Sequence, residues 1–421
     1  MLPGSIYNYD LLYDKNYYGE RLNKNYFSDR QLKYRIIRNG YIFISNPNDG
    51  FFDSGVFDSK GDYIEGTSLH NEPESQKILK LSDNELKTSR HISSTVIYAG
   101  LFFGLWGHFI TDCIKKLWFL KSKDYIEKFS DCPIVYIPMG GFKLKGNHKR
   151  FLEILGIDCS RLAPVTELTH YDSVIVPDES FFCSDECIFF TDEYKAMIDS
   201  VRDFAVSHRM PSNIKKVYYS HSRFGNGQTF GEDKLERYFA SKGYEIIYPE
   251  KLSLDEQLNI LINCGSFAST IGSCSHNIIF LRDNTEVILI PRADYLTGYQ
   301  ETINQLHSLR ISYVDSSFSI FVEKFAWRGP FLYFVSSNLR KYFHDEDTSD
   351  IIDVSDFMHY LKANPPADNI DSYRYYSIIA AKYFSQLFTL KRDKTLKEKL
   401  KKITLLRKAV RAVRKILSFI R

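Results

Sequence analysis

The chain has 421 residues, of which 44% are hydrophobic and 25% charged, a composition that indicates a globular protein and excludes a disordered one. A chain of this length is too long to fold around one ordinary hydrophobic core, so we predict two domains with additional segments. The net charge of +3 is unevenly spread, because thirteen lysines and arginines stand against two acids between Lys391 and Arg421. The rest of the chain is therefore acidic, which argues against a nucleic-acid-binding body.

The first predicted elements are strands. Residues 39–66 have hairpin chemistry, with strand-like stretches separated by Asn-Pro, Asp-Gly and Lys-Gly-Asp turns. The apolar segment 101–120 follows, and we interpret it as a buried helix that carries His108 and Asp112 one turn apart on one face. Polar residues interrupt this segment, and the sequence has no run of about 20 apolar residues, so no membrane span is predicted.

Strands and helices then alternate along the chain. The predicted strands are residues 132–138, 172–177, 244–249, 266–270 and 286–291, and a further strand begins the segment 215–223. The predicted helices are residues 147–156, 191–208, 231–243, 253–265 and a helix start at 275–282. This alternation predicts the α/β class, with two Rossmann-like domains facing across a cleft. In such sheets ligands bind beyond the carboxyl ends of the strands, so we expect the chemistry in the cleft.

We expect four regions. They are an N-terminal domain with a hairpin-rich start over residues 1–205, a C-terminal domain over 206–345, a helical segment over 346–390 and a basic tail over 391–421. Apolar residues of the tail form one helical stripe, with lysine and arginine on the other faces. The stripe consists of Leu396, Leu400, Ile403, Leu406, Val410, Val413, Leu417 and Ile420. This pattern predicts a basic amphipathic helix on anionic lipid, and the alternative is a helix docked on the protein's own acidic body.

The N-terminus lacks the charged and apolar regions of a signal peptide. The seven cysteines are irregularly spaced, which indicates reduced thiols. Cys183 and Cys187 form the only close pair, and no second pair follows at zinc-site spacing, so no metal site is predicted. We therefore predict a cytoplasmic protein attached peripherally to the inner face of the cell membrane through its tail.

Two turns between predicted strands and helices are candidate anion sites. In the first, Arg223 precedes Gly225, Gly227 and Gly231, and glycines there let the backbone approach a phosphate. An ordinary loop is the alternative, because the spacing differs from GxGxxG. The second turn, residues 269–277, offers hydroxyl, imidazole and amide groups beside backbone N–H groups. Its candidate donor-binding residues are Gly272, Ser273, Ser275, His276 and Asn277. Capping of the following helix by Ser273 or Ser275 is compatible with that role.

Four segments together resemble glycosyltransferase family 61, and within it the bacterial capsular polysaccharide biosynthesis proteins. They are residues 96–119, Arg223 after its strand, residues 235–261 and residues 267–280, within a similarity that covers about residues 35–295. The resemblance implies a GT-B fold and an inverting transferase that uses a nucleotide-sugar without an essential metal. It also implies that the C-terminal domain binds the donor and the N-terminal domain the acceptor.

The resemblance also implies roles for single residues. Arg223 would pair with the donor diphosphate, and Glu256 with Gln257 matches a Glu-Gln pair of the family, although Glu256 also fits a capping box with Ser253. Further matches are Glu232, at the start of a helix, and Gly272 and Asn277, in the family's HGAGLTN turn. Ile271 stands where that turn has its histidine, and His276 would supply an imidazole instead.

His108 and Asp112 match the family's GHFxxD motif. An inverting transfer needs a base that takes the proton of the acceptor hydroxyl. Either Asp112 is this base, or His108 is the base and Asp112 orients it. In the structural alternative, Asp112 pairs with Lys115 or Lys116, and His108 is a core residue.

The expected function is a hexosyl- or pentosyltransferase that moves a sugar from a nucleotide-sugar donor. The acceptor would be a capsular or other cell-surface polysaccharide, or its lipid-linked precursor. A non-catalytic glycan-binding protein is one alternative. A dinucleotide-dependent oxidoreductase is another, although no GxGxxG motif with a later acid supports it.

Overall fold

A computed structural model describes both predicted halves of the chain. The described residues are 5–12, 15–43, 54–68, 80–184, 187–223, 229–292, 296–318, 330–348, 350 and 353–363. Gly225, Gly227 and the tail over 391–421 lie outside them, as does most of the predicted helical segment over 346–390. The last element described is α10 (Val354–Ala363).

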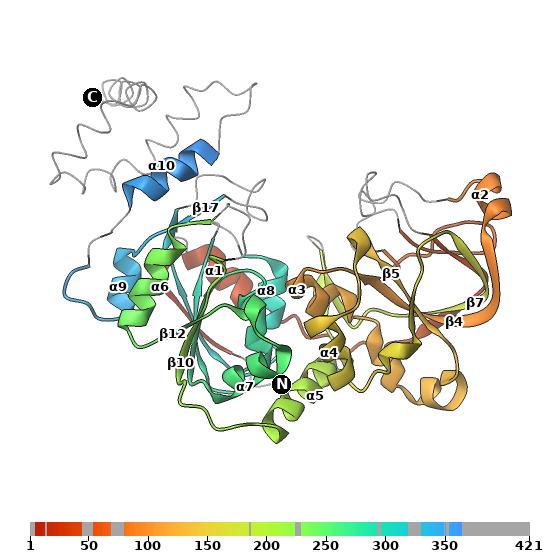
Figure 1. The fold of residues 1–421 in the computed structure, drawn as a ribbon, viewed down its shortest axis with the longest axis horizontal. Helices are drawn as coiled ribbons and strands as arrows, with labels where there is room; N and C mark the ends of the chain where they lie inside the picture. Colours follow the sequence, from red (N-terminus) through yellow and green to blue (C-terminus); the bar gives the residue numbers. More distant parts are fainter. Residues whose placement is uncertain are drawn as a thin grey trace.

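A six-stranded parallel sheet forms one lobe (Figure 1). Its strands in spatial order are β1 (Ile6–Leu11), β15 (Arg310–Val314), β14 (Glu286–Ile290), β13 (Ser266–Thr270), β10 (Lys216–Tyr219) and β12 (Glu245–Ile247). Its helices are α6 (Glu232–Ser241), α7 (Leu254–Asn263), α8 (Gly298–Ile303), α9 (Ser337–Tyr342) and two 3₁₀ helices, Pro249–Lys251 and Ser275–Phe280. The alternation predicted for residues 215–291 is therefore confirmed.

Local signals explain where the helices of this lobe begin and end. At α7, Ser253 Oγ accepts from the Glu256 N–H at 3.3 Å, and the Glu256 carboxylate accepts from the Ser253 N–H at 2.8 Å. This is the predicted capping box. Gly243 follows α6 with a φ of 81°, a left-handed conformation that glycine adopts without a side-chain clash.

The second large sheet also has six strands but is mixed. Its order is β3 (Gly55–Phe57), β2 (Tyr34–Phe43), β7 (Thr169–Pro177), β4 (Arg90–Phe102), β5 (Ile134–Pro138) and β6 (Leu162–Pro164). Its helices include α2 (Asp83–Thr88), α4 (Gly146–Ile154) and α5 (Asp192–Ser207). β2 runs antiparallel to β3, as the hairpin chemistry predicted. It also runs antiparallel to β7, so this half departs from the fully parallel sheet of a Rossmann-like domain.

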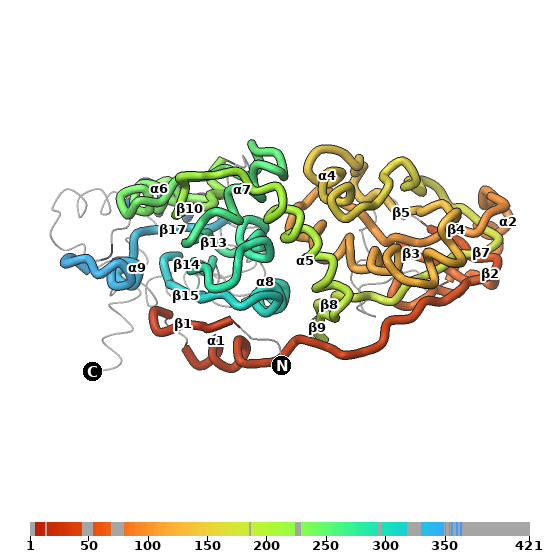
Figure 2. Tube along the Cα trace, turned by 90° about the horizontal axis from the view of Figure 1, so that it is seen from below, coloured from red at the N-terminus to blue at the C-terminus, as the bar shows by residue number. Residues whose placement is uncertain are grey.

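The N-terminal segment lies on the lobe of the fully parallel sheet. β1 pairs in parallel with β15, and α1 (Lys15–Leu22) lies beside it before the chain runs to β2 in the other lobe (Figure 2). The sequence analysis had grouped this segment with residues 1–205. A six-residue edge strand carries no signal for its partner, because its pairing is decided by a strand about 300 residues away.

The helix predicted over residues 101–120 is wrong in its extent. β4 continues to Phe102, and a short α-helical turn, α3 (Trp106–His108), leads into a π-helical turn, Phe109–Cys113, and a 3₁₀ helix, Leu117–Lys121. An apolar run that ends a buried strand looks the same in sequence as a buried helix. We call residues 106–113 the histidine–aspartate turn.

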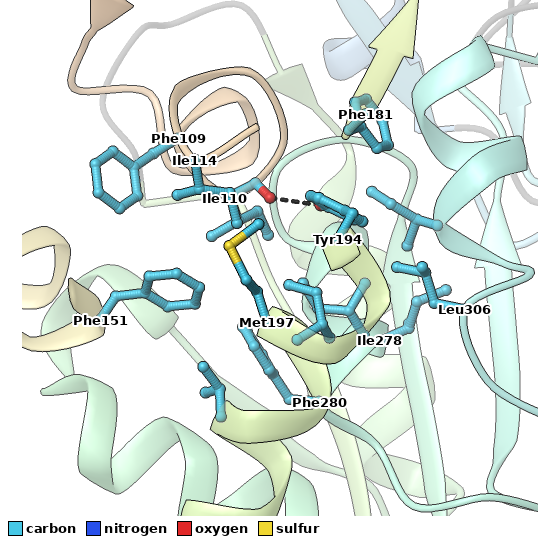
Figure 3. Close-up of a cluster of buried hydrophobic side chains, with 14 of the residues drawn as sticks. Phe109, Ile110, Ile114, Phe151, Phe181, Tyr194, Met197, Ile278, Phe280 and Leu306 are labelled. Carbon is cyan, nitrogen blue, oxygen red and sulfur yellow. Dashed lines mark hydrogen bonds between the residues drawn. The ribbon is translucent and has the colours of Figure 1, made fainter. Parts of the chain in front are cut away.

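One hydrophobic core joins the two lobes around this turn. Figure 3 shows Phe109 and Ile110 of the turn packed with Phe151 of α4, Met197 of α5 and Phe280. The Tyr194 hydroxyl of α5 donates to the Ile110 carbonyl at 2.6 Å, which ties the turn to that helix. The turn is therefore fixed in a packed interior between the two sheets.

Smaller elements complete the described structure. They are β8 (Phe181–Cys183) with β9 (Ile188–Phe190), β11 (Thr229–Phe230) with β17 (Phe331–Tyr333) and β16 (Ser317–Phe318), the π-helical turn Tyr125–Phe129, and the 3₁₀ helices Met139–Gly141 and Cys159–Arg161. Among the helices that the structure describes, none combines the length and the apolarity that a membrane crossing needs.

Candidate active site

A cavity of about 870 Å³ lies between the two lobes, within the usual size range of small-molecule sites. From the mixed sheet it is lined by residues 104–108, which follow β4, and by most of residues 142–148, which follow β5. From the parallel sheet it is lined by His221, Pro249, Glu250, residues 271–274, His276, Asn277 and Arg292. These segments follow the carboxyl ends of their strands, where the sequence analysis expected the ligand site.

His108 and Asp112 form a close pair at this cavity. His108 Nδ1 lies 2.7 Å from Asp112 Oδ2, and the Asp112 carboxylate also accepts from the Thr111 hydroxyl at 3.3 Å. The Asp112 side chain is only 4% exposed, whereas that of His108 is 29% exposed and lines the cavity. With Nδ1 bonded to the carboxylate, proton exchange with a substrate would pass through Nε2 of the imidazole.

Tyr299 is a neighbour of this pair that the sequence analysis did not identify. Its hydroxyl donates to Asp112 Oδ1 at 3.0 Å, and its ring packs edge-on against the His108 ring. Burial and the nearby Asp112 raise the pKa of Tyr299 well above its usual value, so the hydroxyl stays protonated as a donor. Asp112 is therefore held as a hydrogen-bonded carboxylate by donors from two different elements.

The N-terminal segment supports the helix that carries Tyr299. Arg21 forms an ion pair with the buried Glu301 of α8, and the Tyr26 hydroxyl donates to the same carboxylate at 2.6 Å. The N-terminal segment therefore contacts α8 two residues away from Tyr299, which hydrogen-bonds Asp112.

The structural alternative names Lys115 and Lys116 as partners of Asp112, and both lysines lie next to Glu179. Lys115 Nζ lies 2.7 Å from Glu179 Oε1, and Lys116 Nζ lies 3.8 Å from the same oxygen while it donates to the Pro177 carbonyl at 2.9 Å. The two lysines therefore pair with Glu179, and the Asp112 carboxylate contacts His108.

The histidine–aspartate turn packs directly on the second predicted anion site. We call residues 271–277 the serine turn. A β-carbon on Gly107 would lie 2.8 Å from His276 Nδ1 and 2.9 Å from Ser273 Oγ, so only glycine allows this approach. The Trp106 indole N–H donates to Asn277 Oδ1 at 2.9 Å. Two segments about 170 residues apart thus meet at one cavity wall.

Members of the serine turn have different roles. Ser275 is fully buried, and its hydroxyl accepts from the Gly272 N–H at 2.9 Å, so it holds the turn rather than lining the cavity. Ser273 and Asn277 line the cavity. His276 also lines it, and burial lowers its pKa to about 3, so its imidazole is neutral. Ile271 is 5% exposed and lines the same wall.

Arg292 is the cation of the parallel-sheet lobe that lines the cavity, and the sequence analysis missed it. It follows β14, and its guanidinium lies 5.0 Å from the ring centre of Phe331. Among the described residues it has no hydrogen-bond or ion-pair partner. Gly272 has a φ of 150°, and a β-carbon there would overlap the guanidinium, so the glycine makes room for this charge. The sequence signal that could have identified Arg292 is its position directly after a predicted parallel strand.

Besides Ser275, two more predicted donor-binding residues do not line the cavity. Arg223 is exposed, and its guanidinium stacks 3.9 Å from the ring centre of Tyr248. Glu256 caps α7, as described above. Neighbouring Gln257 lines the cavity and donates to the Pro249 carbonyl at 2.9 Å. The structure therefore brings together His108, Asp112, Gly272, Ser273, His276 and Asn277 of the predicted site, and adds Tyr299 and Arg292.

Glu232 is a buried carboxyl group below this wall. Its Oε1 accepts from the His221 N–H at 3.0 Å, and it is 2% exposed. Burial raises its pKa to about 7, with nearby Glu236 acting in the same direction and Arg292 in the opposite one. A carboxyl group whose folded-state pKa is raised binds its proton more tightly in the folded protein than in the unfolded chain.

We therefore expect Glu232 to make the free energy of unfolding fall as pH rises from about 4.5 to about 7. In Glu232→Gln this decrease should disappear, so the variant gains up to about 3 kcal/mol relative to wild type above pH 7. Urea unfolding at several pH values measures both curves. If the free energy of unfolding depended on pH in the same way in both proteins, the raised pKa of Glu232 would be contradicted.

The described histidines, cysteines and carboxylates form no group of three or more that could hold a metal ion. Comparison with curated proteins gave no match. A family model, Glycosyltransferase 61, matches residues 106–288. The match begins at the histidine–aspartate turn and includes the serine turn, whereas Arg292 and Tyr299 lie beyond it. It supports glycosyltransferase family 61 as the family of this part of the chain and points to glycosyltransferase activity in general.

Proposed function

We propose that this protein is an inverting glycosyltransferase of the bacterial capsular type, which moves a hexosyl or pentosyl group from a nucleotide-sugar onto a cell-surface polysaccharide or its lipid-linked precursor. The observation that carries the proposal is the contact between the histidine–aspartate turn and the serine turn at one cavity. The contact supports the proposal because residues suited to accept a proton and residues suited to bind an anion line the same cavity from two sheets. In this proposal the two lobes act as the two domains of a GT-B enzyme.

His108 is the base in this mechanism, and Asp112 is a positioning residue. The Asp112 carboxylate is 4% exposed, does not line the cavity and is already hydrogen-bonded to Tyr299 and Thr111, so it is not placed to contact the acceptor hydroxyl. His108 reaches the cavity and has Asp112 behind it, so an imidazolium formed during the reaction is stabilised.

The transfer is one displacement. Nε2 of His108 takes the proton of the acceptor hydroxyl while the hydroxyl oxygen bonds to the anomeric carbon of the donor sugar. The bond from that carbon to the diphosphate oxygen breaks on the opposite face, and its electron pair leaves with the diphosphate. Arg292 faces the developing negative charge with a planar, permanently charged group.

Incubation of the full chain with UDP-, GDP-, CMP- and dTDP-sugars and a panel of glycan acceptors tests the proposal. The expected result is release of one nucleotide together with a glycan product heavier by one sugar, measured by mass spectrometry. Glycan binding without nucleotide binding would instead favour the non-catalytic alternative. Binding of NAD or NADP without nucleotide-sugar binding would favour the oxidoreductase.

The proposal includes peripheral attachment to the inner face of the membrane through the basic tail 391–421, where a lipid-linked acceptor would be located. Each lysine or arginine near anionic lipid contributes about 1 kcal/mol of attraction. Removal of residues 391–421 is therefore expected to abolish co-sedimentation with phosphatidylglycerol vesicles. Equal sedimentation of the full and shortened chains would exclude the tail as the membrane contact.

A further inference from the structure

A basic loop from the mixed sheet forms another wall of the cavity. Residues 140–146, which we call the lysine loop, follow β5 and contain three glycines with positive φ, namely Gly140 at 55°, Gly141 at 71° and Gly146 at 55°. Between them, Phe142 and Leu144 are half-buried, and Lys143 and Lys145 are exposed. This alternation is that of extended backbone, in which every second side chain points to the same side. The two lysines therefore share one face.

Phe142 anchors the loop next to the histidine–aspartate turn. Its ring centre lies 6.2 Å from that of Phe109 and 5.3 Å from that of His148. Phe109 directly follows His108 in the chain. The anchor therefore places the loop beside the proposed base.

The lysine loop also separates two cavities. Phe142 and Lys143 line both the main cavity and a second one of about 370 Å³, whereas Lys145 lines the main cavity. The second cavity is otherwise lined by Tyr136, Leu144, Lys149, Cys159, Leu162 and Pro164. A ligand that extends from the main cavity across Phe142 would therefore meet an aromatic ring and a lysine at the boundary.

Neither lysine of the loop is neutralised within the described structure. Lys143 and Lys145 have no ion-pair or hydrogen-bond partner there. Lys149, on the adjacent helix, lies 3.5 Å from Glu153. Of the other groups near the loop, burial lowers the pKa of His148 and leaves it neutral, and Glu250 is an exposed carboxylate on the opposite lobe. Two adjacent positive charges thus face a cavity that already has a separate cation, Arg292, on its other side.

We propose that Lys143 and Lys145 bind an anionic group, a phosphate or a carboxylate, on the acceptor glycan. This inference rests on the proposed function, because it assigns the donor diphosphate to Arg292 and the parallel sheet. The lysines come from the mixed sheet and adjoin the second cavity, so they select an acceptor that carries negative charge beyond the reacting hydroxyl. Lysine suits this task because an ammonium attracts phosphate and carboxylate as a point charge without a fixed geometry.

Calorimetric titrations of the full chain with glucose, glucose 6-phosphate, glucuronate and pyrophosphate test the inference. Wild type should bind at least one of the two anionic sugars and bind glucose more weakly, and it should still do so when saturated with pyrophosphate. Lys143→Gln/Lys145→Gln should weaken that binding by about tenfold or more and leave pyrophosphate affinity within about twofold. Phosphate and carboxylate selectivity are distinguished by which sugar binds.

The matched control is Lys123→Gln/Lys128→Gln, which removes two exposed lysines of the same lobe that do not line either cavity. It should leave all affinities unchanged. Failure of wild type to bind either anionic sugar, displacement of that sugar by pyrophosphate, or equal affinity in the loop variant would overturn the inference. Pyrophosphate binding that is insensitive to Arg292→Ala would instead contradict the donor assignment in the proposed function, which separates the two failures.

Discussion

Replacement of His108 by alanine is expected to lower the rate constant of sugar transfer by about 10²–10⁴-fold, the usual contribution of a general base. The imidazole lines the cavity and is 29% exposed, so its removal should leave the fold and the affinity for nucleotide nearly unchanged. Nucleotide release measured at saturating donor and acceptor reports the rate constant, and thermal unfolding reports the fold.

The matched control for this variant is His91→Ala. His91 also pairs with an aspartate, with Nε2 3.1 Å from Asp172 Oδ1, but it lies at the start of β4, away from the cavity. His91→Ala therefore shows what the loss of a histidine–aspartate contact does to the rate when the pair lies outside the cavity, and we expect no change. Wild-type transfer rates in His108→Ala would show that the base is another group.

Asp112→Asn distinguishes the two roles of the pair. If Asp112 positions His108, the variant keeps a hydrogen-bonding side chain but no longer stabilises the imidazolium. The maximal rate should then fall, while the KM for the donor changes little and the remaining activity still depends on His108. A larger loss of rate in Asp112→Asn than in His108→Ala would instead indicate Asp112 as the base itself.

Arg292→Ala is expected to weaken binding of UDP or GDP by about 10- to 100-fold, because a hydrogen-bonded charge pair contributes about 1.5–3 kcal/mol. Among the described residues the guanidinium has no competing partner, and Gly272 leaves space for it. Arg292→Lys should give an intermediate affinity, because an ammonium keeps the charge but loses the two-pronged geometry. Calorimetry with each nucleotide measures all three proteins.

Arg223→Ala decides between the two arginines. The sequence analysis assigned Arg223 to the diphosphate, whereas its guanidinium lies over Tyr248 and outside the cavity lining. We therefore expect a small effect in this variant and a large one in Arg292→Ala. A larger loss of nucleotide affinity in Arg223→Ala than in Arg292→Ala would instead assign diphosphate binding to Arg223.

Local physics determined much of this protein from its sequence. Alternating apolar strands and amphipathic helices over residues 215–291 specify a parallel sheet, because each element can bury only one pattern of side chains. The capping box at Ser253 and Glu256 forms within four residues and is therefore readable without the fold. The contact of His108 with Asp112 is likewise local, since a helical turn brings residues four apart together.

Tertiary structure alone decided how these pieces form a site. The extent of β4 into the apolar segment depends on both faces of the sheet being covered, which a buried helix would satisfy equally well. Tyr299 reaches Asp112, and Arg292 reaches Gly272, only because separate strands end at one cavity. Such contacts join residues far apart in the chain, and no spacing or periodicity in the sequence encodes the distance between them. The sequence therefore determines the reactive groups and the local turns that carry them, whereas the packing of two sheets selects which groups face a common ligand.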